Sequence, residues 1–155
     1  MIFQNQPIFI YTKELIQDVL EFEHNLRKEE DFYTWNIDDK YITDVSSSFN
    51  NPYFNSSISL LAYIDGKVVG RIDSSMICSH FDDSIKAYLD WICVLPAYRH
   101  KGIGQGLLEE LKKSLKELGI DSLIAITASN EEARHFYSSI PDSKMEDIAI
   151  WIDIK

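Results

Sequence analysis

The sequence predicts an α/β fold, on three observations. Two β-prone runs at 57–64 and 67–78 are separated only by Asp65-Gly66, a two-residue turn typical of a β-hairpin. Further along, a long helical pattern connects two apolar strands, and a crossover of this kind makes the two strands parallel. A chain of 155 residues suits one core, so residues 1–155 are expected to form a single domain.

Each element rests on the spacing of its apolar residues. In the first helix, Val19, Phe22 and Leu26 recur at helical intervals and trace one buried face. Strands are indicated by short runs rich in β-branched and aromatic residues. The expected elements, besides the hairpin, are a strand at 7–11, helices at 13–30 and 37–49, a polar connection at 79–87, a strand at 89–95, a helix that begins at Gly102, a strand at 122–127, a helix at 130–137 and one long final strand at 144–154, with a minimal or missing strand before it.

The helix after the strand at 89–95 begins in an unusual way. Its first residues, 102–106, contain three glycines, and each costs roughly 1 kcal/mol of helix stability relative to alanine. Packing alone explains such costs poorly. A helix N-terminus has unpaired N–H groups and a partial positive charge, and the lack of Cβ atoms lets a phosphate reach them. Because residues 99–101 are Arg, His and Lys, the sequence predicts a pyrophosphate site here.

The spacing of these residues separates the known kinds of phosphate site. It fits neither the dinucleotide-binding G-x-G-x-x-G pattern nor the P-loop pattern. Arg99-x-x-Gly102-x-Gly104, preceded by Val94-x-Pro96, resembles the signature of the GCN5-related N-acetyltransferase (GNAT) superfamily. The alternative is a glycine-rich turn beside an incidental basic loop. The resemblance implies the GNAT acyl-CoA N-acyltransferase fold, a mixed, mostly antiparallel central sheet with one splayed parallel pair and about four flanking helices.

The resemblance also implies acetyl-CoA as a co-substrate, and it implies the residues that hold it. Asn130 stands where the family contacts the pantetheine arm, although a helix N-cap explains this residue equally well. Tyr137 stands where the family places a general acid for the departing thiolate, and a core aromatic is the alternative. The implied cofactor-binding residues are Ile92, Cys93, Val94, Arg99, His100, Lys101, Gly102, Ile103, Gly104, Asn130 and Tyr137.

Acetyl transfer to an amine also needs a base, which takes a proton directly or through water. The resemblance implies a carboxylate four residues before Val94, and Asp90 stands there; a strand-end aspartate in a salt bridge is the alternative. Strict alternation would put Asp90, Ile92 and Val94 on one face, but the family predicts a β-bulge at this point. Backbone N–H groups freed around 92–94 would polarise the thioester carbonyl. The candidate catalytic residues are Tyr137 and Asp90.

The segment from 29 to 39 combines carboxylates with aromatic residues and contains no Lys or Arg. In the family this segment, between the first two helices, overhangs the acceptor groove. Carboxylates and aromatic rings suit a cationic amine, whereas a solvated helix end on an acidic protein explains the same charges without any ligand. The candidate acceptor residues are Asp31, Tyr33, Trp35 and Trp91.

Composition limits the partners and the location. The net charge of −10 disfavours nucleic acid and anionic membranes. No apolar run approaches the roughly 20 residues of a membrane span, and no secretion signal is evident, so a cytoplasmic protein is expected. The four histidines have no spacing that predicts a metal site, so no metal is expected. The sequence leaves open whether the chain forms a homodimer.

Taken together, the residues and the resemblance predict an N-acetyltransferase that moves the acetyl group of acetyl-CoA to a primary amine by direct attack in a ternary complex. The expected acceptor is a small cationic amine, polyamine-like or aminoglycoside-like; a peptide amino terminus and a protein lysine stay open. The end of the chain, near Ile152 to Ile154, is similar to aminoglycoside 3-N-acetyltransferases. The alternative function is a sensor or regulatory module with the same fold that holds acetyl-CoA or CoA without turnover.

Overall fold

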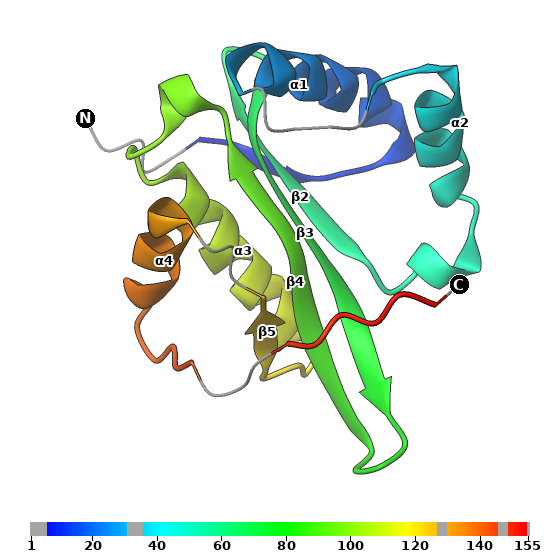
Figure 1. Ribbon diagram of the computed structural model, residues 1–155, viewed down its shortest axis with the longest axis vertical. Coiled ribbons are helices and arrows are strands. Elements are labelled where there is room, and N and C mark those ends of the chain that lie inside the picture. Colours follow the sequence, from blue (N-terminus) through cyan, green and yellow to red (C-terminus); the bar gives the residue numbers. More distant parts are fainter. Residues whose placement is uncertain (1–5, 31–35, 127–129, 146–148, 155) are drawn as a thin grey trace. The chain divides into compact units, whose positions relative to one another are not determined.

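The computed structural model describes residues 6–30, 36–126, 130–145 and 149–154 (Figure 1). The chain forms two compact units, residues 1–124 and 125–155. The elements are β1 (Ile8–Ile10), α1 (Ile16–Glu29), α2 (Asp39–Ser48), β2 (Ile58–Ile64), β3 (Lys67–Ser79), β4 (Ser84–Val94), α3 (Ile103–Glu117), β5 (Leu123–Ala125) and α4 (Glu131–Ser138). Among the described residues, no helix has the length and apolar character that a membrane span requires.

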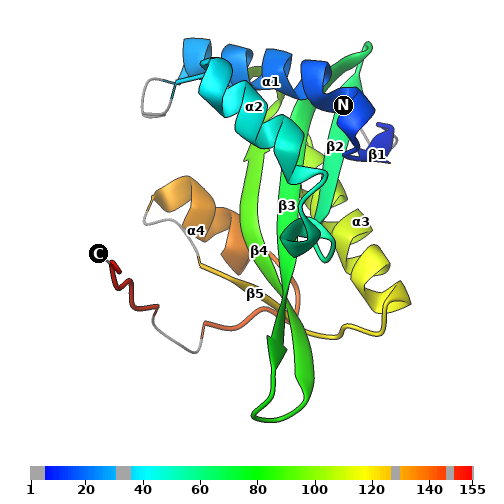
Figure 2. The same ribbon diagram turned by 90° about the vertical axis from the view of Figure 1, so that its right-hand side faces the viewer.

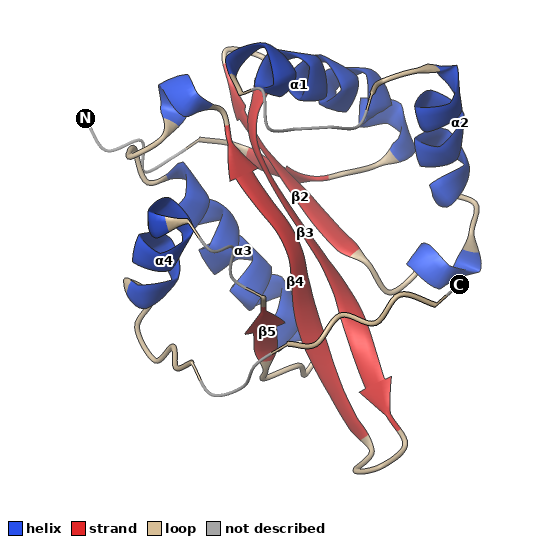
Figure 3. Cartoon of the chain, viewed as in Figure 1, coloured by secondary structure: helices blue, strands red, loops and turns tan. Residues whose placement is uncertain are grey.

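The sheet has five strands in the order β1-β2-β3-β4-β5. The first four strands pair antiparallel in sequence order. β5 runs parallel to β4 (Figure 3), and the N–H of Ala87 in β4 donates to the carbonyl of Ser122 at 2.9 Å. The predicted mixed, mostly antiparallel sheet with one parallel pair is therefore confirmed.

Helices cover both faces of the sheet in the first unit (Figure 2). α1 packs on one face, where Val19, Phe22 and Leu26 join a buried cluster with Leu61 and Cys93. α3 packs on the other face and approaches β3 closely at Gly70. A Cβ atom added there would lie 3.1 Å from side-chain atoms of both Ile103 and Leu107. The predicted helices are confirmed, and so are the buried faces of α1 and of α3 as far as Leu115. Leu118, which the spacing also places on the buried face of α3, is 64% exposed, because the helix ends at Glu117 and the chain turns away there.

The hairpin between β2 and β3 turns where the sequence predicts. Asp65 and Gly66 both have positive φ, 50° and 74°, as a two-residue hairpin turn with matching twist requires. The next connection is shorter than expected: of the polar connection expected over 79–87, residues 84–87 belong to β4 and only 80–83 form the turn. The hairpin that β4 forms with β3 extends to the pair Ser79 and Ser84. Alternating polar residues in a half-exposed strand resemble a loop in the sequence.

The second unit contains α4 and the end of the chain. Asn130 caps α4, since its side chain accepts a hydrogen bond from the N–H of Ala133 at 2.8 Å, so the N-cap prediction is confirmed. The long final strand is wrong for the described residues 144–145 and 149–154, which belong to no strand. Trp151 and Ile152 are instead about four-fifths exposed. An alternating apolar pattern forms a strand only where a neighbouring strand accepts its hydrogen bonds.

Candidate functional site

A β-bulge interrupts the pairing of β3 with β4. Asp73 pairs with Trp91, but the next β3 residue, Ser74, pairs with Leu89. Asp90 is therefore the extra residue, and its side chain is exposed. The predicted bulge is confirmed, but it lies at Asp90 and not around 92–94, since residues 92–94 pair regularly with residues 70–72. Because it shifts the alternation, Asp90 no longer belongs to a regular face of the strand.

The residues after the bulge divide between the two faces of the sheet. Ile92 pairs with Ile72, and Val94 pairs with Gly70, which faces α3. Cys93 belongs to the buried cluster on the α1 side, and Trp91 is half-buried against the same cluster. Within the described part of the chain Asp90 forms no ion pair, so the salt-bridge interpretation of this residue is wrong there.

The segment between β4 and α3 adopts the backbone that the glycines permit. His100 and Gly102 have positive φ, 58° and 85°, in the left-handed region where glycine is favoured. Gly102 is the residue that precedes the first turn of α3, and it supplies no side-chain cap. Among the described residues, a Cβ atom built on Gly102 would have no neighbour within 4 Å, so no other side chain crowds this position before the first turn of α3. This arrangement fits the approach of an anionic group to the helix end.

Gly106 has a different explanation from the one that the sequence suggests. A Cβ atom there would lie 3.0 Å from the side-chain nitrogen of Gln6. Its small size therefore serves packing against the segment before β1. For Gly106, packing against Gln6 is thus an explanation that needs no ligand.

The basic side chains of the segment bind groups of the protein itself. Arg99 donates from Nε to the carbonyl of Val94 at 2.9 Å and from Nη1 to a carboxylate oxygen of Glu30 at 2.6 Å. The Lys101 amine donates to the carbonyl of Ala97 at 2.8 Å and lies 5.2 Å from the centre of the Tyr98 ring. Arg99 thus fastens the segment to the end of β4 and to the residue after α1.

The remaining candidates lie elsewhere. Asn130 and Tyr137 belong to the second unit, where the ring of Tyr137 meets that of Phe136 edge-on at 5.3 Å. Asp31, Tyr33 and Trp35 lie outside the described residues. The first unit therefore brings together Asp90, residues 92–94 and residues 99–104 at one end of β4. Where it describes the chain, the structure groups no three His, Cys, Asp or Glu side chains as a metal site would. The absence of a metal stays a prediction.

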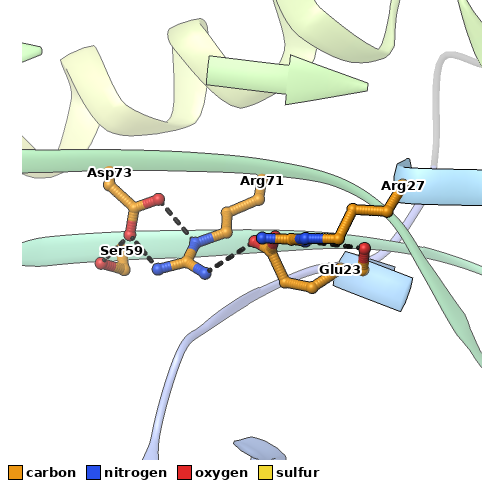
Figure 4. A network of polar contacts seen from close by, with 5 residues as sticks. All are labelled: Glu23, Arg27, Ser59, Arg71 and Asp73. Carbon is orange, nitrogen blue, oxygen red and sulfur yellow. Dashed lines mark hydrogen bonds and ion pairs between the residues drawn. The ribbon is translucent and has the colours of Figure 1, made fainter. Parts of the chain in front are cut away.

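One charged cluster was not anticipated from the sequence. Arg71 and Asp73 of β3 lie beside Glu23 and Arg27 of α1 on the inner side of that helix (Figure 4). Burial alone would lower the pKa of the Arg71 guanidinium, but the neighbouring Asp73 and Glu23 carboxylates raise it above its ordinary value. A signal was present in the sequence, since Glu23 stands on the apolar face of α1.

Two tyrosines have perturbed hydroxyl groups in the first unit. Burial raises the pKa of Tyr11 to about 12, and the Arg71 guanidinium lies 5.2 Å from the centre of its ring. Burial and a hydrogen bond donated to Asp18 at 2.8 Å raise the pKa of Tyr63. Both groups are protonated at neutral pH, so neither is a base for proton transfer.

Comparison with known proteins decides the family. The family model described as "Acetyltransferase (GNAT) family" matches residues 13–139. The chain belongs to the GNAT family. A search of curated proteins finds none that matches this GNAT protein.

Solved structures share the fold over nearly the whole chain. An aminoglycoside acetyltransferase from an uncultured soil metagenomic sample, in complex with sisomicin, has a TM-score of 0.79 at 16% identity and 96% coverage of each chain. AAC(6')-Iy, in complex with the bisubstrate analogue CoA-S-monomethyl-acetylneamine, has a TM-score of 0.75 at 17% identity, with 98% of this chain and 100% of that chain covered. Ribosomal-protein-alanine N-acetyltransferase from Brucella melitensis biovar Abortus 2308 has a TM-score of 0.74 at 15% identity, with 97% and 99% covered.

Proposed function

We propose that this GNAT protein transfers the acetyl group of acetyl-CoA to a primary amine by direct attack in a ternary complex. The observation that carries the proposal is the bulge at Asp90, which stands on the same strand end as the glycine-opened start of α3. A bulge frees backbone groups from the ladder, and the open helix end suits a pyrophosphate. The two features therefore combine a binding place for the cofactor with a place for its reactive end.

The first unit supplies most of the proposed cofactor site. The backbone of residues 99–104 would hold the pyrophosphate, with Gly102 at its centre because no Cβ obstructs the first N–H groups of α3. Arg99 acts on this segment through Val94 and Glu30, so we assign it to shaping the segment rather than to an exposed phosphate contact. The full proposed set is Ile92, Cys93, Val94, Arg99, His100, Lys101, Gly102, Ile103, Gly104, Asn130 and Tyr137.

We assign two proton transfers to side chains of this protein, one from the attacking amine and one to the departing thiolate. Acetyl-CoA supplies an acetyl thioester, whose carbonyl carbon the amine attacks while the thiolate leaves. Asp90 accepts the proton that the amine loses, directly or through water, and its exposed carboxylate is open to solvent for that purpose. Tyr137 donates a proton to the departing sulfur. We assign the stabilisation of the charge that develops on the carbonyl oxygen to backbone N–H groups next to the bulge, at Asp90 or in the residues 92–94 that follow it.

The proposed acceptor is a small cationic amine, aminoglycoside-like or polyamine-like. The net charge of −10 attracts cations, and Trp91, half-buried on the α1 side of β4, is an aromatic residue of the type that binds cations. Two of the similar structures carry sisomicin and a neamine derivative in their names. A third is named for the alanine of ribosomal proteins, so a peptide amino terminus is the second acceptor to test. Asp31, Tyr33 and Trp35 stay proposed acceptor residues with Trp91.

The test measures thiol release from acetyl-CoA in the presence of one amine at a time. The panel consists of an aminoglycoside, a polyamine and a peptide with an amino-terminal alanine. We expect thiol release that depends on the aminoglycoside or the polyamine and exceeds release without amine. Acetyl-CoA binding measured by calorimetry, with no turnover on any amine, would instead support the sensor alternative. An absence of acetyl-CoA binding would contradict both functions.

A further inference from the structure

Both β3 residues at the register shift are fastened to β2 by their side chains. The Asp73 carboxylate accepts a hydrogen bond from the Ser59 hydroxyl at 2.6 Å. The Ser74 hydroxyl donates to the carbonyl of Ile58 at 3.1 Å, and Ser74 is only 3% exposed. The pairing of β3 with β4 is interrupted between these same two residues. Two extra links to β2 therefore stand directly opposite Asp90.

A chain of ion pairs holds Asp73 from the side of α1 (Figure 4). Arg71 donates to the Asp73 carboxylate from Nε at 2.6 Å and from Nη2 at 3.0 Å. Nη1 of Arg71 also lies 3.5 Å from a carboxylate oxygen of Glu23. Glu23 in turn pairs with Arg27 at 2.6 Å. The carboxylates and the guanidinium groups balance, and together they connect β2, β3 and α1.

Stability alone is a weak reason for such a network. The four charged side chains are at most 18% exposed, so each loses most of its hydration. Apolar residues of similar volume often stabilise a protein as well as a buried ion pair does, or better. We propose that Asp73 and Ser74 are positioning residues for acetyl transfer, which hold the bulge at Asp90 in its working geometry. This inference rests on the proposed function.

The pairing explains how the two residues act on the bulge. Because Asp73 pairs with Trp91 and Ser74 pairs with Leu89, β3 holds β4 on both sides of Asp90. Register in a sheet depends on which residues pair, and a slip turns side chains to the opposite face. Bonds from β3 to β2 oppose such a slip. A displacement of about 1 Å at a reacting group can lower a rate by about 100-fold, so a small movement of Asp90 or of the N–H groups after it is sufficient.

The test uses two variants of the full chain that remove the links in different ways. Ser74→Ala removes one hydroxyl. Arg71→Met combined with Asp73→Leu removes both charges of the pair, so neither is left buried without its partner, and Glu23 keeps Arg27. Ser114→Ala is the control, because it also removes a partly buried hydroxyl that binds a carbonyl, near the far end of α3.

We expect kcat to fall by about 10- to 100-fold in both test variants, at a temperature where each is fully folded. The KM for acetyl-CoA should stay at the wild-type value, because residues 99–104 are untouched. Hydrogen exchange of the backbone amides from Asp90 to Ile92 should become faster in Ser74→Ala and stay unchanged in Ser114→Ala. A merely structural role would lower the melting temperature and leave both kcat and local exchange alone.

The experiment distinguishes a failure of the positioning role from a failure of the proposed acetyltransferase function. Wild-type kcat in both test variants, with the unmodified protein active, overturns the positioning role and leaves the acetyltransferase proposal standing. An unmodified protein that binds acetyl-CoA but acetylates no amine removes the proposed function, and the positioning role is overturned with it. An equal loss of kcat in Ser114→Ala would also contradict the inference, since that variant lies away from the bulge.

Discussion

Helix α3 has a glycine with positive φ at each end, and the two ends are completed in different ways. At the C-terminal end, Gly119 (φ 74°) lets the chain turn so that the N–H of Ile120 donates to the carbonyl of Leu115 at 2.9 Å. At the N-terminal end, Gly102 (φ 85°) offers no side chain to cap the first N–H groups. The chain itself closes the C-terminal end, whereas at the N-terminal end Gly102 provides no side-chain cap. The same residue type thus has a structural purpose at one end and, under the proposed function, a binding purpose at the other.

The largest effect is expected from removal of the Tyr137 hydroxyl, which should lower kcat without weakening the binding of acetyl-CoA. Tyr137→Phe keeps the ring that contacts Phe136 and removes only the hydroxyl, so kcat should fall by about 10²- to 10⁴-fold, the usual range for a general acid. The KM for acetyl-CoA should not change. Steady-state kinetics with the best amine of the panel measure both, and Tyr53→Phe is the control because Tyr53 is 92% exposed. Wild-type kcat in Tyr137→Phe would make this tyrosine a packing residue.

A substitution on the buried face in the middle of α3 should lower the free energy of unfolding and leave kcat unchanged. Leu111 is fully buried, so Leu111→Ala should lower the free energy of unfolding by about 2–5 kcal/mol, from lost burial and the cavity left behind. Urea denaturation measures this loss. Leu118→Ala, at a site that is 64% exposed, should change stability by less than about 0.5 kcal/mol. Equal losses in the two variants would contradict the assignment of the buried face of α3.

The two glycines provide a matched pair of substitutions. Valine at either position meets open space but must adopt a positive φ, so Gly102→Val and Gly119→Val should each cost about 1–3 kcal/mol of stability. Only Gly102→Val should lose the rise in melting temperature that acetyl-CoA gives the unmodified protein, since ligand binding stabilises the folded state by mass action. Thermal melts over a series of acetyl-CoA concentrations measure both effects. A normal rise in Gly102→Val would remove the pyrophosphate from this end of α3.

The sequence predicts best those features of the structure that depend on residues close together in the chain. The Asp65-Gly66 turn and the apolar face of α1 are local patterns, and both were predicted correctly. The bulge at Asp90 came from family resemblance, because alternation in β4 alone would have placed Asp90 on a regular face. The roles of Gly102 and Tyr137 stay predictions.

Features that depend on distant partners were missed. Gly106 lies against the side chain of Gln6, and the ion pairs of Arg71 reach from β3 to α1. Neither contact follows from spacing along one segment. The prediction of a final strand was wrong for a related reason, because the apolar alternation near Trp151 does not indicate whether a neighbouring strand is present to pair with it. Local patterns therefore predict elements and turns, whereas pairs of distant residues require the structure.

The smallest effect should come from the lysines at the two ends of α3. Lys101→Met removes a cation beside the proposed pyrophosphate site, so acetyl-CoA affinity should fall a few-fold, and the loss should shrink at high salt because exposed charges are screened over about 10 Å at 0.1 M ionic strength. Lys116→Met removes a cation from the last turn, where the lysine interacts favourably with the partial negative charge of the helix end. The free energy of unfolding should therefore fall by about 0.3–1 kcal/mol, while the affinity for acetyl-CoA should not change. Calorimetry at two salt concentrations and urea denaturation test the pair. If Lys116→Met weakened acetyl-CoA binding as much as Lys101→Met does, the difference between the ends would reflect the overall charge of the protein and not a site at the open end.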